Sequence, residues 1–159
     1  MARELDMGAF DAARVEGWAA TDDPIAVLLG EHRTILQVLD EIDRETTRLE
    51  NGGPLREAFF ADVVQFADEF DTGLHHQKEE QLLFPALERA GLDPRLGPTA
   101  VLRDEHLRIR FCRDRLAQAL ASRDRTRLGA AASHYTAHGR AHVLKENQLV
   151  FPLCRRLLS

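Results

Sequence analysis

The chain has little cysteine, and its two thiols are not arranged for cross-linking or for binding metal. Cys112 and Cys154 lie far apart and outside any CxxC or CxxCH arrangement. A disulfide framework, a thiolate zinc site and covalent haem attachment therefore have no support in the sequence. We predict that both cysteines pack as small apolar side chains.

Several motifs that mark common enzyme classes are also missing. The sequence contains no GxSxG, no HExxH and no glycine-rich phosphate loop, so the usual hydrolase, zinc-protease and nucleotide-binding functions have no basis. It contains no ExxH either. The ferritin-like type of di-iron site, which uses ExxH on two helices, is therefore not expected.

A net positive charge and long apolar runs are absent as well. The formal net charge is -5 and the pI is near 5.8, which leaves no large positive field for a nucleic acid backbone. The first 22 residues lack an apolar core flanked by basic residues, so we expect no secretory signal, no membrane association and a cytoplasmic location.

What the sequence does contain is helical periodicity. At 159 residues the chain is long enough for one hydrophobic core. Apolar residues repeat at helical spacing over about 24–50 and over 54–91. A third stretch begins at Pro98, and a fourth begins after a cap at Ser122 or Asp124. No stretch alternates as a strand would. We predict an all-α, antiparallel up-down-up-down four-helix bundle over 23–159, preceded by a short N-terminal arm over 1–22.

A repeat within the second and fourth helices suggests the chemistry. The segments HHQKEEQLLFP and HVLKENQLVFP share HxxKE, followed five residues after the glutamate by Phe-Pro, and the first and third helices each add one histidine after a glutamate. The spacing i, i+4 places histidine and glutamate on one helix face. Two such pairs facing each other favour a binuclear metal site, built from His32, His75, Glu79, His106, His142 and Glu146.

A single histidine at a core position is more often a structural, hydrogen-bonded residue than a ligand. Here, however, each of the four apolar stripes carries one histidine, and the HxxxE pair is duplicated. Burying unpaired carboxylates among leucine and phenylalanine would cost several kcal/mol, which bound cations would remove. Imidazole with carboxylate suits iron, manganese or zinc.

These segments resemble the hemerythrin-like family, also called the HHE cation-binding domain, over about residues 24 to 157. The resemblance is carried by LLGEHRTILQVLDEI, FADEFDTGLHHQKEEQLLFPALERAG, GPTAVLRDEH and HVLKENQLVFPL. It implies that the six residues named above bind two iron ions linked by an oxo or hydroxo bridge, with Glu79 and Glu146 as bridging carboxylates. Iron is expected ahead of manganese or zinc.

One feature departs from the oxygen-carrying hemerythrins, whose third helix offers two histidines a turn apart. Here Leu102 and Arg110 flank His106. His76 is the candidate for the missing ligand, because some members of the family place a further ligand there; a surface or hydrogen-bonding role is the alternative. His138 and Tyr135 are candidates for lining the pocket or supporting the ligands, with plain packing as the alternative.

Counting coordination positions indicates that one or two remain open on two octahedral irons. We therefore expect the chain to bind or sense a small oxidant, such as dioxygen or nitric oxide. An enzyme acting on peroxide, or an oxidase, is the first alternative, and iron storage or a structural metal is the second. The sequence leaves the oligomeric state undetermined. It also predicts that Pro85 and Pro152 kink or stop their helices just beyond the metal layer.

Overall fold

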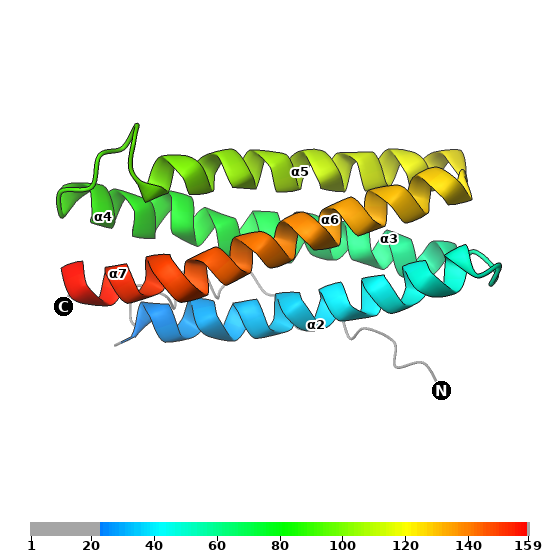
Figure 1. The fold of residues 1–159 in the computed structure, drawn as a ribbon, viewed down its shortest axis with the longest axis horizontal. Coiled ribbons are helices and arrows are strands. Elements are labelled where there is room, and N and C mark those ends of the chain that lie inside the picture. The colour runs from blue at the N-terminus through cyan, green and yellow to red at the C-terminus, as the bar shows by residue number, and fades with distance from the viewer. Residues whose placement is uncertain (1–22, 159) are drawn as a thin grey trace.

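A computed structural model describes residues 23–158, and these residues form four antiparallel helical rods without a strand. The N-terminal arm, with the predicted domain boundary at residue 22, lies outside the described residues. Figure 1 shows the rods running alternately in opposite directions, so that the last residues of the chain lie at the same end as the start of the first rod. The predicted fold class is confirmed.

The first rod is α2 (Pro24–Glu50), which starts where the sequence predicted. The side chain of Asp23 accepts a hydrogen bond from the backbone N–H of Ala26 at 3.0 Å, and Pro24 fills the first helical position, where no backbone donor is needed. The third rod is α5 (Pro98–Ser122), which likewise opens on a proline. The fourth rod begins with α6 (Arg125–Lys145), capped by Asp124, the second of the two predicted caps.

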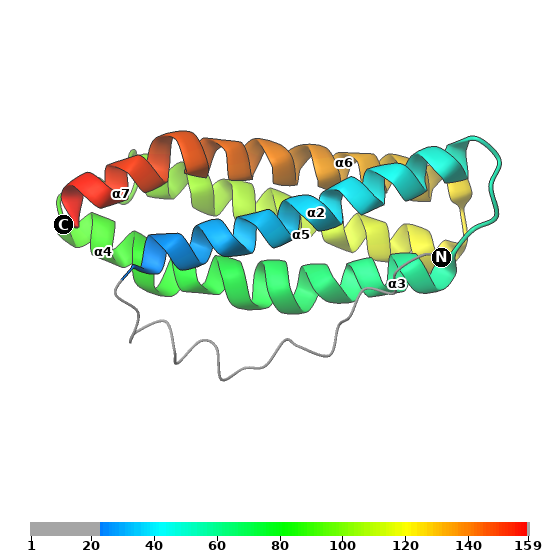
Figure 2. The same ribbon diagram turned by 90° about the horizontal axis from the view of Figure 1, so that it is seen from below.

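The second and fourth rods are not uniform α-helices. The second consists of α3 (Glu57–Phe66), the π-helical segments η3 (Ala67–His76) and η4 (Glu79–Leu83), and α4 (Phe84–Arg89). The fourth continues from α6 through the π-helical segment η5 (Glu146–Val150) into α7 (Phe151–Leu157). Figure 2 shows both rods continuing through these changes. π-helical turns are rare and are frequently found at functional sites.

Pro85 and Pro152 widen their helices rather than ending them. Each lies just after a π-helical segment, at the second residue of the α-helix that follows. A proline provides no N–H and its ring collides with the carbonyl four residues earlier, so a wider turn before it relieves the collision. The wider turn rotates the side chains within it, so that the apolar Leu82 and Leu149 are 39% and 65% exposed.

The apolar core is divided into two clusters by a polar layer. One cluster contains Leu39, Phe66 and Leu116, and the other contains Leu28, Phe84 and Leu102. Along each rod, the predicted ligands lie between residues of the two clusters. Both cysteines are free and buried in these clusters, as predicted. In the described part of the chain, no helix combines the length and apolarity needed to cross a bilayer.

Candidate metal centre

All six residues predicted as ligands meet in the polar layer between the clusters. Each of them is buried, with at most 2% of its surface exposed: His32, His75, Glu79, His106, His142 and Glu146. Together with His76 they form two groups, within each of which the ligand atoms lie within 4.8 Å of one another, and both groups include Glu79. The first group contains His32, His75, Glu79 and Glu146; the second contains His76, Glu79, His106 and His142.

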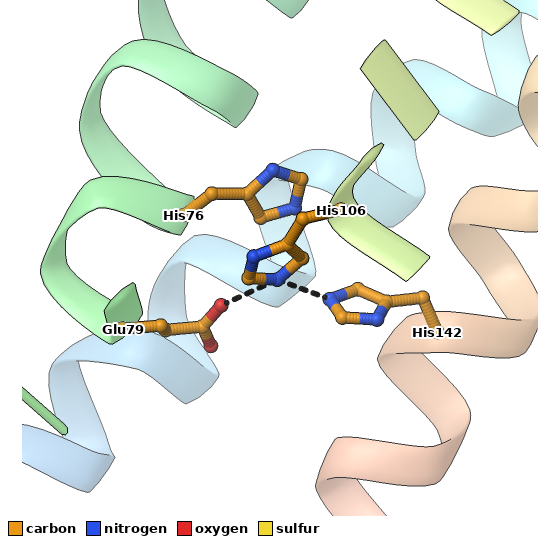
Figure 3. Close-up of side chains that lie close together, drawn as sticks. All are labelled: His76, Glu79, His106 and His142. Carbon is orange, nitrogen blue, oxygen red and sulfur yellow. Dashed lines mark hydrogen bonds and ion pairs between the residues drawn. The ribbon is translucent and has the colours of Figure 1, made fainter. Parts of the chain in front are cut away.

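The ring nitrogens within each group point at one another. The Nε2 atoms of His32 and His75 are 3.0 Å apart, and those of His106 and His142 are 3.1 Å apart. The second group comes from the second, third and fourth rods, and Figure 3 shows its side chains converging on one small volume. Each close pair therefore joins the histidine of one rod to the histidine of the HxxxE in the next rod along the chain.

The other nitrogen of each ring is engaged outward. Nδ1 of His75 lies 3.0 Å from Glu31, and Nδ1 of His142 lies 3.0 Å from Glu105. Nδ1 of His106 lies 2.7 Å from Glu80. A carboxylate only accepts hydrogen bonds, so in each case the ring Nδ1–H donates. In a neutral imidazole the opposite nitrogen, Nε2, then carries a lone pair and no hydrogen.

His32 follows the same rule with a different partner, because its Nδ1 donates to the amide oxygen of Asn147 at 2.7 Å. Four lone pairs thus face inward in two close pairs. Two lone pairs about 3 Å apart repel each other unless a positive charge lies between them. The donor set of neutral rings therefore fits a pair of cations.

The two inner carboxylates each touch both groups. Glu79 lies 3.5 Å from Nε2 of His75 and 3.2 Å from Nε2 of His106. Glu146 lies 3.1 Å from Nε2 of His32 and 3.3 Å from that of His142. None of their four oxygens has a hydrogen-bond donor. This is the placement that a bridging carboxylate requires, and bridging itself stays a prediction.

Charge burial acts strongly on these acids. Desolvation, followed by the charge of Glu146, raises the pKa of Glu79 well above its ordinary range. Desolvation also acts to raise the pKa of Glu146, but the neighbouring His142 and His32 outweigh it and lower that pKa to about 2. Such opposed shifts in two buried, adjacent acids are typical of functional sites.

His76 has no hydrogen-bond partner on either ring nitrogen, although it is 1% exposed. Its ring stacks on that of His106, with centroids 3.8 Å apart, as Figure 3 shows. Burial and then the neighbouring His106 hold the pKa of His76 well below its ordinary range, so the ring stays neutral and able to bind a cation. The surface location considered for His76 is excluded, and its role as a ligand stays a prediction.

The two supporting candidates differ. Tyr135 is buried and its hydroxyl donates to the Asp71 carboxylate at 2.7 Å; burial and then Asp71 raise the pKa of Tyr135. The other oxygen of Asp71 lies 3.4 Å from Nε2 of His76. His138 is exposed, so its predicted place beside the site is wrong. Gly139, packed against Leu39, takes the inward position one residue later.

Sequence reasoning missed the outward partners. Glu31 and Glu105, which accept from Nδ1 of His75 and His142, each form an ion pair with a lysine as well. Lys78 pairs with Glu31, and Lys145 pairs with Glu105. Hydrogen bonds from His142 and then Lys145 lower the pKa of Glu105 to about 2, against burial. The signal for these residues was present in the repeat, since glutamate precedes the histidine in the first and third rods and lysine stands three residues after it in the other two.

Comparison with known proteins agrees with the geometry. Residues 23–154 match the model of the hemerythrin HHE cation binding domain. Two uncharacterized proteins, one from Mycobacterium bovis and one from Mycobacterium tuberculosis, are each 30% identical over 138 residues, which is 83% of this chain. The chain spans about half the length of these curated relatives, 53%. No solved structure matches it.

Proposed function

Because the chain belongs to the hemerythrin HHE cation-binding family, we propose that it holds two iron ions in the polar layer and binds or senses a small oxidant there, such as dioxygen or nitric oxide. The observation that carries the proposal is the convergence of four Nε2 lone pairs and two unpartnered carboxylates in a buried layer. Such a layer is unfavourable without cations.

Iron is proposed on the chemistry of the donors. The layer offers imidazole nitrogen and carboxylate oxygen, with no thiolate among the residues of either group. This mixture suits iron ahead of the harder magnesium and calcium, which prefer oxygen alone. Two iron ions held by these residues would supply redox chemistry and open coordination positions for a small ligand. The residues of the chain orient the donors and keep water out.

Breakdown of peroxide is a second candidate function, favoured by one observation. The hydrogen-bonded pair of Tyr135 and Asp71 is buried directly beside His76, and a protonated group held next to a metal site is what general acid catalysis needs.

The proposed location of the protein is the cytoplasm.

Metal analysis of freshly purified protein, with an absorption spectrum before and after exposure to oxygen, tests the proposal. We expect about two irons per chain, as the two groups of ligands imply, and a near-ultraviolet charge-transfer band. A spectrum that changes with dioxygen and reverses under vacuum supports reversible binding. Gas release from peroxide faster than with free iron supports the second function instead. Two zinc ions without visible absorption would overturn both.

A further inference from the structure

The outward hydrogen bonds of the four histidines repeat with the sequence, except at one position. Glu31 and Glu105 occupy equivalent places in the first and third rods, and each accepts from a histidine and a lysine of the next rod. His75 and His142 therefore donate to acceptors of the same charge. Between the halves, a difference in the charge of the acceptor can therefore arise only at the remaining two histidines of the repeat, His32 and His106.

These two histidines have chemically different partners. Glu80 and Asn147 are equivalent in the repeat, since each directly follows an inner glutamate. Glu80 accepts from Nδ1 of His106 at 2.7 Å, and Asn147 accepts from Nδ1 of His32 at the same distance. Geometry is thus conserved between the halves while the charge of the acceptor differs. A glutamate carries a full negative charge and an amide carries none.

Resting on the proposed function, we propose that Glu80 and Asn147 are positioning residues that make the two metal positions electronically unequal. A carboxylate bonded to the far nitrogen of an imidazole makes the ring a stronger donor to a metal than a neutral acceptor does. His106 therefore stabilises a higher charge on its ion than His32 does. The ion beside His106 is bound more tightly and is reduced at a lower potential.

Arg110 moderates this difference without removing it. Its guanidinium lies 3.2 Å from the same oxygen of Glu80 that accepts from His106. Both side chains are partly exposed, at 28% and 31%, so water and salt screen their attraction. The hydrogen bond to His106 is shorter and more buried at its donor, and it remains the dominant contact of Glu80.

Exchange of the two acceptors provides the test. The full-length chain would be titrated with Co²⁺ in competition with a chelator, as wild type, Glu80→Gln, Asn147→Glu, and the double exchange Glu80→Asn with Asn147→Glu. Crystals loaded with one equivalent of cobalt would show by anomalous scattering which position is filled. His76 is unchanged throughout, so whatever it contributes cancels between variants.

We expect Glu80→Gln to weaken binding about 10- to 100-fold at the His106 position alone, since this is the usual effect of losing a partner of a ligating histidine. Asn147→Glu should tighten the His32 position, and the double exchange should move the cobalt preference toward it. In the iron-loaded protein, Glu80→Gln should raise the lower midpoint potential, by ~59 mV for each tenfold change in the ferric-to-ferrous affinity ratio.

Two controls and the contrary outcomes complete the design. Glu80→Asp keeps a carboxylate and should retain part of the cobalt affinity that Glu80→Gln loses. Glu69→Gln removes an exposed acid of the same rod and should change neither the cobalt affinity nor the midpoint potential. Equal weakening at both positions in Glu80→Gln, or an unchanged cobalt preference in the double exchange, would overturn the inference. If the wild type bound no cobalt or iron, the proposed function itself would fail; two bound ions insensitive to these changes would leave that function standing and reject the inequality alone.

Discussion

At the scale of single residues, the inner glutamates Glu79 and Glu146 favour metal binding but lower the stability of the metal-free protein. Both oxygens of Glu79 are buried without a donor, and desolvation raises the pKa of its carboxyl. Folding without metal therefore forces this group either to keep a proton or to bury a charge. Bound cations reverse the balance, because the same charge then becomes a ligand.

Glu79→Gln should have opposite effects on the two forms of the protein. The apoprotein should gain about 1–3 kcal/mol in free energy of unfolding at neutral pH, because an ionisable group no longer has to be buried unpaired. Metal affinity should fall at least about tenfold, because a shared ligand is lost. Urea denaturation with chelator and with added metal measures both. A loss of stability in the chelated form would contradict this account.

His76→Ala tests whether the unpartnered imidazole binds metal. If it does, metal affinity should fall by about tenfold or more and the absorption spectrum should change, because a nitrogen donor is lost from the second group. His138→Ala serves as a matched control, since His138 is exposed on the same bundle. Identical metal binding in the two variants would assign His76 a packing role.

At the scale of elements, the starts of the first, third and fourth rods were readable from the sequence, whereas the second rod begins at Glu57 and not at the predicted residue 54. The π-helical segments were not predicted. Asp23 and Pro24, and later Pro98, gave local signals for helix starts, because caps act within one turn. The inward or outward direction of Leu82 and Leu149 depended on an inserted residue that a constant period of 3.6 cannot represent. Pro85 and Pro152 carried that information, since each stands at the same distance from its HxxxE.

The junction between α5 and α6 contains a strained backbone position that a glycine should relieve. Arg123 adopts a φ of 53° in the left-handed region after the end of α5, where a side chain costs about 1–2 kcal/mol. Arg123→Gly should therefore raise the free energy of unfolding by up to about 1 kcal/mol, the extra freedom of the unfolded chain offsetting part of the gain.

The ion pair of Arg123 with Glu57 is lost in that variant, but both side chains are largely exposed, and such pairs contribute little. Glu57→Gln measures this contribution separately by the same denaturation experiment. A destabilisation in Arg123→Gly larger than that in Glu57→Gln would show that the junction is not strained.

At the scale of the whole molecule, the sequence predicted which residues face the metal layer but not which residues on neighbouring rods contact one another. The duplicated HxxxE and one histidine on each remaining rod were sufficient to bring six buried residues into one layer, because helical spacing fixes faces. The partners of Nδ1 come from neighbouring rods, as with Asn147 and His32, 115 positions apart. Pairing of this kind follows from the relative height of the rods, which periodicity leaves free.

Acid should destabilise the metal-free protein through the outer carboxylates. Hydrogen bonds from His142 and Lys145 lower the pKa of Glu105 from 4.5 to about 2. A group whose pKa is lower in the folded state stabilises above its unfolded pKa and loses that effect as pH falls through the folded value. The free energy of unfolding should thus decline between about pH 4.5 and pH 2.

Glu105→Gln should flatten this decline, which denaturation at a series of pH values with chelator present would measure. Glu69→Gln, which changes an exposed acid, provides the comparison and should leave the curve unchanged. An equal flattening in both variants would mean that general charge, and not the bond to His142, governs acid stability.

The loop between α4 and α5, residues 90–97, separates the chain into two hairpins, and apart from the candidate His76 each hairpin contains three of the predicted ligands. His32, His75 and Glu79 belong to the first hairpin, and His106, His142 and Glu146 belong to the second. If that loop were cut, neither fragment would contain all the predicted ligands. The two fragments would then have to associate in a bimolecular step that bound metal ions would stabilise. The molecule would then work as a split reporter whose reassembly is switched on by metal supply.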